Sequence, residues 1–255
     1  MTLNLDPHLV SMPSLLSALN ELSVDSGTGV YSPKGLEVIS IMWTKVAAQQ
    51  RLMYQATWLD RPIIQLPSDI LVLQEVIWET KPDVIVETGV AHGGSLILAA
   101  SILELAGHGK VIGVDVDIRP HNRKAIEEHP LSHRIELIEG DSVSERTLDQ
   151  VRELIPDGSR VMVALDSNHS GDHVTKELEA YSALVSQGCY LVAHDGAQFW
   201  VWDLPDAAEH WSYDHPLNAI RDFLEVNTQF SIDETRTRFG ITSSPAGYLF
   251  RSESS

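Results

Sequence analysis

Two acids and two histidines fall within the eight-residue segment 166–173, directly after an apolar stretch. Asp166 offers the carboxylate oxygens that a hard divalent cation such as Mg²⁺ prefers, and His169 is of a type that accepts a proton near neutral pH. A second polar pair, His194-Asp195, follows a later apolar stretch. If the two stretches are neighbouring strands, Asp195 lies beside Asp166, and the sequence predicts a cation site with two carboxylates. The alternative is that both acids cap helices or face solvent.

His194 is a weaker candidate ligand, although we include it with Asp166 and Asp195. Adjacent residues of a regular strand point to opposite faces of the sheet, and imidazole is a poor ligand for Mg²⁺. The same segments also allow another reaction, hydroxylation by non-haem iron, which uses two histidines and one carboxylate. His169, His194 and Asp195 supply those types, but such a triad usually occupies a jelly roll and not the doubly wound sheet expected here.

A glycine-rich turn within residues 84–95 predicts where a cofactor binds. An apolar run ends in Glu87 and opens through Gly89 onto a helical pattern, and Gly93 and Gly94 would let a ligand approach the main chain closely. In a dinucleotide fingerprint counted from Gly89, a second glycine would stand where this chain has Ala91. Glu87 would also repel a pyrophosphate. Both features favour S-adenosylmethionine, and a tight turn without any ligand is the alternative.

Polar residues after the next two apolar runs would complete the cofactor site. Asp115 and Asp117 close the run at 111–114, and the two oxygens of Asp115 can accept hydrogen bonds from both ribose hydroxyls. Asp117 points to the same side because side chains alternate along a strand. Asp141 and Ser142 would lie near the adenine. The alternative for these acids is helix capping or solvation.

The elements that must position these residues alternate regularly from residue 83 onward. Five apolar strands separated by crossover helices predict an α/β fold with a mostly parallel, doubly wound sheet and a site at the carboxyl ends of its strands. The expected strands are 84–87, 111–114, 135–138, 161–165 and 190–193, with an antiparallel pair, 230–232 and 247–250, at the edge. The expected helices are 94–105, 123–128, 148–154, 174–185 and 216–226.

Residues 1–80 are expected to form a helical extension of a single Rossmann-like unit, 81–255. Within the extension, residues 1–30 show no sustained hydrophobic period, whereas helical spacing runs from Pro33 to about Trp58. A further helix is expected up to residue 80, with Ser68 as its N-cap.

Three tryptophans lie between the last parallel strand and the last helix: Trp200, Trp202 and Trp211. They would form an apolar lid or a wall that stacks on a sugar, and a packed connection or a subunit interface is the alternative. Together with the irregular start of the chain, they suggest a homo-oligomer.

Composition limits the partners of the chain. Its 255 residues include 18 basic and 36 acidic side chains, and the resulting net charge of −18 opposes contact with nucleic acid or anionic lipid. The single cysteine, Cys189, cannot form an internal disulfide. The start of the chain lacks a basic and apolar leader, and no apolar run approaches the ~18 residues of a membrane span. We therefore expect a cytoplasmic protein, without a membrane span, that acts on a small molecule.

Several of these segments together resemble the family of cephalosporin hydroxylases, which includes rhamnosyl and other sugar O-methyltransferases. The resemblance covers roughly residues 33–251. It is carried by the segments 87–95, 113–117, 165–170 and 244–249, with further likeness at 58–63 and 74–75.

The resemblance implies a class I methyltransferase that uses S-adenosylmethionine, often with Mg²⁺. Members usually have Glu-Asp where this chain has His194-Asp195, so the third metal ligand differs. Carried over residue by residue, the resemblance implies that Glu87, Gly89, His92, Gly93 and Ser95 line the cofactor, that Asp115 meets its ribose, and that Asp166 and Asp195 hold the metal.

The reaction expected from these residues is transfer of a methyl group from a sulfonium to a hydroxyl of a sugar or of a glycosylated or small natural product. The enzyme would align the reactants, a divalent ion would polarise the hydroxyl, and His169 or Asp166 would take its proton. Two other interpretations stay open. One is an NAD-linked oxidoreductase, and the other is a non-catalytic subunit that binds S-adenosylmethionine for a partner enzyme.

Overall fold

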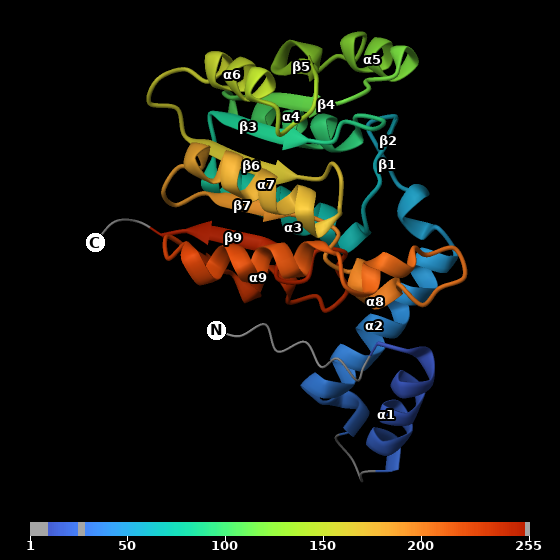
Figure 1. The fold of residues 1–255 in the computed structure, drawn as a ribbon. Helices are drawn as coiled ribbons and strands as arrows, with labels where there is room; N and C mark the ends of the chain where they lie inside the picture. The colour runs from blue at the N-terminus through green and yellow to red at the C-terminus, as the bar shows by residue number, and fades with distance from the viewer. Residues whose placement is uncertain (1–9, 25–28, 253–255) are drawn as a thin grey trace.

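A computed structural model describes residues 10–24 and 29–252. At its centre is a seven-stranded sheet, made of β3 (Val84–Thr88), β4 (Lys110–Asp115), β5 (Ile135–Glu139), β6 (Val161–Leu165), β7 (Tyr190–Ala193), β8 (Phe230–Ile232) and β9 (Tyr248–Arg251). The strand order is β5-β4-β3-β6-β7-β9-β8 (Figure 1). The first five strands in this order are parallel, and β9 runs antiparallel to both β7 and β8. The expected parallel sheet with an antiparallel edge pair is confirmed.

Helices cover both faces of the sheet (Figure 1). On one face lie α6 (Glu145–Leu154), α7 (Gly171–Tyr181) and α9 (Pro216–Val226), and on the other lie α3 (Pro67–Thr80), α4 (Gly94–Ala106) and α5 (Pro120–Glu127). Side chains alternate between these two layers along each strand. In β3, for example, Val84 and Val86 belong to the α6–α7–α9 core, whereas Ile85 between them belongs to the α3–α4–α5 core.

The register of the central strands brings their carboxyl ends level with one another. Thr88, the last residue of β3, pairs with Val114 of β4 and with Leu165 of β6. The residues that follow these strands therefore meet at one edge of the sheet. The chain leaves β3 toward β4 and reaches β6 on the other side, which is the point where ligands bind in doubly wound folds.

The N-terminal region is helical and packs at one end of the sheet domain (Figure 1). It contains α1 (Met12–Val24) and α2 (Pro33–Gln49), and α2 contacts the short helix α8 (Gln198–Val201). Residues 1–30 show no sustained hydrophobic period, yet α1 forms within them, in keeping with the expected helical extension. Residues 1–9 and 25–28 lie outside the described residues. Helix α2 begins where its sequence indicates, because the Ser32 hydroxyl accepts the Gly35 N–H at 3.1 Å.

The predicted helix from Pro33 to Trp58 is too long. It ends at Gln49 because Arg51 has a left-handed backbone, with φ of +54°. The chain then forms the 3-10 turn η2 (Leu52–Tyr54) and a hairpin of β1 (Thr57–Trp58) and β2 (Arg61–Pro62). Leu59 and Asp60 turn this hairpin with φ of +44° and +67°, as a type I′ turn requires.

Other boundaries also differ from the sequence-based prediction. Helices α5 and α6 each begin three residues earlier than expected, at Pro120 and Glu145. Leu66, and not Ser68, is the N-cap of α3, while the Ser68 hydroxyl donates to the Ile241 carbonyl at 2.5 Å. The predicted helix 174–185 begins earlier, at Gly171, and ends at Tyr181, where a 3-10 turn, η4 (Ser182–Leu184), takes over.

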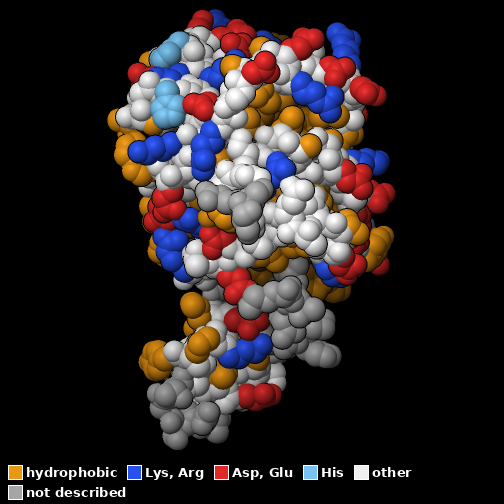
Figure 2. Space-filling model, turned by 90° about the vertical axis from the view of Figure 1, so that its left-hand side faces the viewer, with side chains coloured by type: hydrophobic (Ala, Val, Ile, Leu, Met, Phe, Trp, Pro, Cys, Tyr) orange, Lys and Arg blue, Asp and Glu red, His pale blue; other side chains and the backbone are white. Residues whose placement is uncertain are grey.

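The surface is mixed in charge. On the face in Figure 2, acidic and basic side chains are interspersed and do not gather into one basic patch. No helix among the described residues is long and apolar enough to cross a membrane.

Candidate active site

A cavity of about 890 Å³ opens at the carboxyl ends of β3, β6 and β7, a size typical of small-molecule sites. Three stretches of the chain and one further residue, Ser243, surround it. The stretches are the glycine turn with the loops that follow these strands, the stretch from α2 through β2 to Leu66, and the segment 197–211. The sequence-predicted site residues that line it are Gly89, His92, Gly93, Gly94, Ser95, Asp166, His169 and Asp195.

Asp166, His169 and Asp195 form one cluster, in which the candidate ligand atoms lie within 4.8 Å of one another. The Nε2 atom of His169 is 3.2 Å from Asp195 Oδ2 and 4.0 Å from Asp166 Oδ1. Asp166 and Asp195 come together because they follow β6 and β7, which are neighbouring parallel strands as expected. Asp195 is held with φ of +58°, a left-handed conformation that is uncommon outside glycine.

Negative charge gathers at this cluster. Burial raises the pKa of the Asp166 carboxyl well above its ordinary value, and the nearby carboxylates of Asp195 and Glu87 raise it further. A divalent cation would offset this repulsion, and two carboxylates are the hard oxygen ligands that Mg²⁺ takes. The residues present therefore fit such an ion.

His194 does not join the cluster. Its side chain is 3% exposed, and its Nδ1 atom lies 3.1 Å from the Ser244 hydroxyl. Burial lowers the pKa of His194 to about 4, so the ring is neutral near pH 7. The position expected for His194 beside the two carboxylates is taken by His169. Among the described residues, the set of two histidines and one carboxylate that iron hydroxylation would use is therefore not assembled.

The glycine turn is shaped by close contacts of the protein with itself. Gly89 has φ of +92°, and a Cβ atom there would lie 1.9 Å from the main-chain oxygen of Asp166. A Cβ on Gly94 would lie 2.2 Å from the Pro62 carbonyl oxygen. Ala91, at the position of a second fingerprint glycine, adopts a left-handed backbone with φ of +44°. These glycines thus let the turn pass close to two other loops of the same cavity.

Glu87 lies behind the cavity wall. It is 2% exposed, and the hydroxyl of Ser95, which does line the cavity, donates to its carboxylate. Burial raises the pKa of Glu87 to about 7. The Glu87 carboxyl is therefore connected to the cavity lining through the Ser95 hydroxyl.

Asp115 braces the glycine turn. Its Oδ2 atom accepts the Val90 N–H at 2.8 Å and the Ala91 N–H at 3.2 Å, and its Oδ1 atom accepts the Asp117 N–H at 3.1 Å. Neither Asp115 nor the exposed Asp117 is among the residues that line the cavity. Their strand end adjoins the turn, and the contact observed for Asp115 is with the protein backbone.

Asp141 and Ser142 follow β5 and also lie outside the cavity lining. Asp141 is exposed, and it does not cap α6, whose N-cap is Ser144. Ser142 is buried, with its hydroxyl 3.1 Å from Nε2 of His173.

Two bracing residues were missed from the sequence. The buried Asn122 of α5 donates from Nδ2 to the Ala91 carbonyl at 2.8 Å, and Arg61 of β2 donates from Nε to the His92 carbonyl at 2.9 Å. Arg61 lies within the segment 58–63 that carries the family resemblance, which is the signal that would have found it. Asn122 is one polar residue in a short helix, and its role depends on how that helix packs.

The wall opposite the glycine turn comes from the N-terminal region and the tryptophan segment. Lys45 of α2 is 1% exposed and forms an ion pair with Asp203, which fastens α2 to that segment. Trp211 lines the cavity, whereas Trp200 is buried against the core of α1 and α2. Trp202 is not part of the lining. Trp211 therefore lies where the predicted lid or wall would be, and Trp200 belongs to a packed connection.

Comparison with known proteins places this geometry in a family. The model of the family Rhamnosyl O-methyltransferase/CmcI matches residues 50–252. The rhamnosyl O-methyltransferase of Mycobacterium tuberculosis is 30% identical over 191 residues, which are 72% of this chain and 73% of that protein. That of Mycobacterium leprae is 28% identical over 199 residues, 76% of this chain and 82% of that protein.

Solved structures share the fold. The apo structure of CmcI has a TM-score of 0.55 at 22% identity, covering 79% of this chain and 78% of CmcI. CmcI with Mg and SAM has a TM-score of 0.54 at 22% identity, covering 78% of each chain. An O-methyltransferase from Bacillus cereus in complex with SAH has a TM-score of 0.51 at 17% identity, covering 85% of this chain and 88% of that chain. Since the family match spans the whole sheet domain and most of the cavity lining, the chain belongs to the Rhamnosyl O-methyltransferase/CmcI family.

Proposed function

We propose that the chain is an S-adenosylmethionine-dependent O-methyltransferase that uses a divalent cation and methylates a hydroxyl of a sugar or of a glycosylated or small natural product. The observation that carries this proposal is that one cavity is lined by both the turn from Gly89 to Ser95 and the cluster of Asp166, His169 and Asp195. The relatives named rhamnosyl O-methyltransferase support a sugar acceptor. The structure of CmcI with Mg and SAM supports the cofactors.

The donor side of the cavity would be formed by the glycine turn. Its main chain is held open by Asp115, Asn122 and Arg61, so a ligand meets a pre-formed surface. S-adenosylmethionine supplies the methyl group: its sulfur–carbon bond breaks as the carbon–oxygen bond to the acceptor forms, and the sulfide leaves. Ser95 would face the ammonium end of the donor, with the Glu87 carboxyl behind it.

The acceptor side would be activated by the cluster. Asp166 and Asp195 would hold the cation, which when bound supplies Lewis-acid polarisation of the acceptor hydroxyl. His169 would take the hydroxyl proton as general base, and Asp195 Oδ2, 3.2 Å from its Nε2, would stabilise the imidazolium.

Two measurements test this proposal. Isothermal titration should give tight binding of S-adenosylhomocysteine and none of NAD, and the reverse result would support an oxidoreductase. Turnover with rhamnosides as acceptors and S-adenosylmethionine as donor should then yield a methyl ether. If Asp166→Ala and His169→Ala both leave that turnover unchanged, the assignment of this cluster as catalytic is wrong. Tight binding of S-adenosylhomocysteine without any methyl transfer by the wild type would instead support a non-catalytic binding subunit.

We further propose that residues 1–80 and 81–255 act as one unit, since both line the cavity. A homo-oligomer and a cytoplasmic location complete the proposal. The oligomer is supported by exposed apolar side chains on α2, and the location by the buried, unpaired Cys189.

A further inference from the structure

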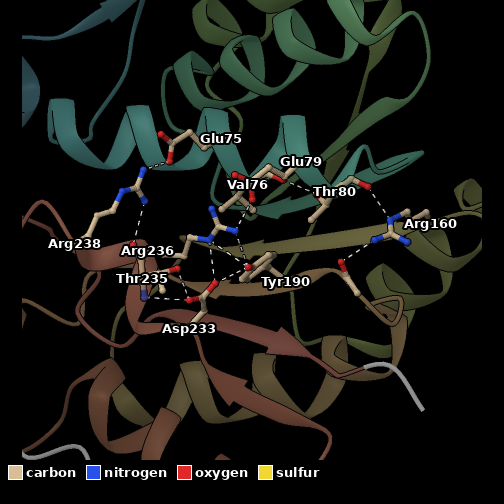
Figure 3. Close-up of polar contacts among 11 residues, drawn as sticks. Glu75, Val76, Glu79, Thr80, Arg160, Tyr190, Asp233, Thr235, Arg236 and Arg238 are labelled. Carbon is tan, nitrogen blue, oxygen red and sulfur yellow. Dashed lines mark hydrogen bonds and ion pairs between the residues drawn. The ribbon is translucent and has the colours of Figure 1, made fainter. Parts of the chain in front are cut away.

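The segment between β8 and β9 is fastened along α3 by ion pairs (Figure 3). Arg236 donates to Glu79 of α3, and its Nε atom lies 3.0 Å from Asp233 Oδ2. The same guanidinium donates to the Tyr190 hydroxyl at 3.0 Å, and two residues later Arg238 pairs with Glu75, one turn back along α3. These contacts hold the first part of the segment, residues 233–238, against α3.

The later part of the segment, at Ser243, is held by a buried carboxylate. Asp69, in the first turn of α3, is 2% exposed. Its Oδ2 atom accepts both the N–H and the hydroxyl of Ser243, each at 2.8 Å. Leaving these buried donors without an acceptor would cost free energy, so Asp69 fixes the backbone at Ser243.

The turn at Ser243 in turn holds the loop that carries Asp195. The Ser243 carbonyl accepts the Ala197 N–H at 2.9 Å, two residues after Asp195. The hydroxyl of Ser244 lies 3.1 Å from Nδ1 of His194, the residue before Asp195. Asp195 is therefore flanked on both sides by contacts with this turn.

Such flanking contacts are needed because Asp195 has φ of +58°. A non-glycine residue keeps a left-handed backbone only when its surroundings over-determine it. Without the turn, the peptide around Asp195 is free to relax toward negative φ, which would swing its carboxylate away from Asp166.

We propose that Asp69 is a positioning residue for the cation site: by holding the turn at Ser243 and Ser244, it fixes the backbone of Asp195 and keeps its carboxylate beside Asp166. This inference depends on the proposed function, because it assigns Asp69 a role in the cation site of that function. Asp69 itself lies outside the cavity lining and touches neither donor nor acceptor.

The test is Mn²⁺ binding, measured by electron paramagnetic resonance of the free ion in the presence of S-adenosylhomocysteine. Asp69→Ala should weaken Mn²⁺ binding by about tenfold or more, the usual effect of removing an outer-shell partner. Asp69→Asn should stay within about threefold of the wild type, because an amide oxygen can still accept both bonds from Ser243. Glu75→Gln, a change on the same helix that breaks the pair with Arg238, should leave Mn²⁺ binding unchanged.

Calorimetric titration with S-adenosylhomocysteine distinguishes a displaced Asp195 carboxylate from a misfolded protein. The affinity for S-adenosylhomocysteine should be unchanged in every variant. If Asp69→Ala also loses this binding, Ser244→Ala decides. It leaves both bonds between Asp69 and Ser243 in place and removes the hydroxyl that contacts His194 and, at 3.5 Å, the Ser243 hydroxyl, so it should weaken Mn²⁺ binding alone. Wild-type Mn²⁺ affinity in Asp69→Ala or in Ser244→Ala would overturn the inference. A wild-type protein that transfers methyl groups but binds no Mn²⁺ would instead overturn the proposed use of a cation, and this inference with it.

Discussion

At the scale of single residues, the proposed proton transfer depends on His169. Replacing His169 with Ala should lower kcat by about 10²- to 10⁴-fold, the range typical of a lost general base. Mn²⁺ and S-adenosylhomocysteine affinities should stay at wild-type values, because Asp166 and Asp195 remain in place. Turnover and titration calorimetry measure these quantities, and Asp172→Asn, an exposed acid three residues away, serves as the control.

A loss of Mn²⁺ affinity in His169→Ala would change the role assigned to His169. If His169→Ala loses Mn²⁺ affinity as strongly as Asp195→Asn, the imidazole is a cation ligand. The base would then have to be another group.

Glu87 makes the stability of the cofactor-free protein depend on pH. Its pKa in the folded state is about 7, against an ordinary 4.5, because the carboxyl is buried. Between these pH values the folded protein holds a proton that the unfolded chain has released, so the free energy of unfolding falls as pH rises and levels off above pH 7. Glu87→Gln removes this dependence. The variant should therefore gain about 3 kcal/mol relative to the wild type between pH 4.5 and pH 7.

Urea unfolding at a series of pH values measures the Glu87 effect. A difference between the variant and the wild type that does not change with pH would contradict it.

At the scale of elements, Gly89 in the turn after β3 can be compared with Gly107, the C-cap of α4. Gly89 and Gly107 both have positive φ, of +92° and +81°, so alanine at either position costs about 1–2 kcal/mol in backbone strain. At Gly107 a new Cβ meets no described atom within 4 Å, whereas at Gly89 it would lie 1.9 Å from the Asp166 oxygen. Gly89→Ala should therefore cost about 3 kcal/mol or more in the free energy of unfolding.

Chemical denaturation of both glycine variants measures the difference. Gly89→Ala should also weaken binding of S-adenosylhomocysteine, while Gly107→Ala should not. Equal losses of stability would mean that the turn can move away from the loop after β6.

The elements that sequence patterns predict well are those with a strong local hydrophobic pattern. The strands 161–165 and 190–193 match β6 and β7, which are continuous apolar runs buried along their whole length. The helix 216–226 matches α9, whose buried apolar residues recur at helical spacing. The hairpin at Leu59 and Asp60 was missed because Leu59 is not a usual type I′ turn residue, although Asp60 is. The short run at α1 gave no clear period, and its apolar residue Leu15 is buried only by tertiary packing, in a cluster with residues of α2 and with Trp200.

The site also has residues that local sequence patterns predict and residues that only contacts between distant parts of the chain reveal. Asp166 and Asp195 could be placed because parallel strand order alone brings their strand ends together. Asp69, Ser243 and Asn122 could not, since each acts across elements that are far apart in the chain. His194 shows the remaining difficulty, because it is next to a cluster residue yet faces Ser244.

At the scale of the whole molecule, the cavity joins parts that a domain division would separate. The sheet domain supplies the glycine turn and the acidic cluster, and the N-terminal region supplies the opposite wall through Arg51 and Tyr54. Lys45 and Asp203 hold the two parts together. Truncation before α3 would thus open the acceptor side of the cavity and leave the donor side formed.

Helix α2 also presents an outward apolar face, which we expect to contact a second copy of the chain. Leu36, Ile39, Trp43 and Val46 recur at helical spacing and are 41–49% exposed, so they form a stripe and not scattered contacts. Light scattering coupled to gel filtration should give the wild type a mass of a dimer or larger. Trp43→Glu should shift it toward the 28.2 kDa monomer, because burying a new charge disfavours association.

Val226→Glu is the control for the stripe on α2. Val226 is 84% exposed at the end of α9, so the same substitution there should leave the mass unchanged. A wild-type mass of 28.2 kDa would contradict the predicted association. A dimer that survives Trp43→Glu would place the contact on another face, and the stripe would then be a solvated surface of the cavity wall.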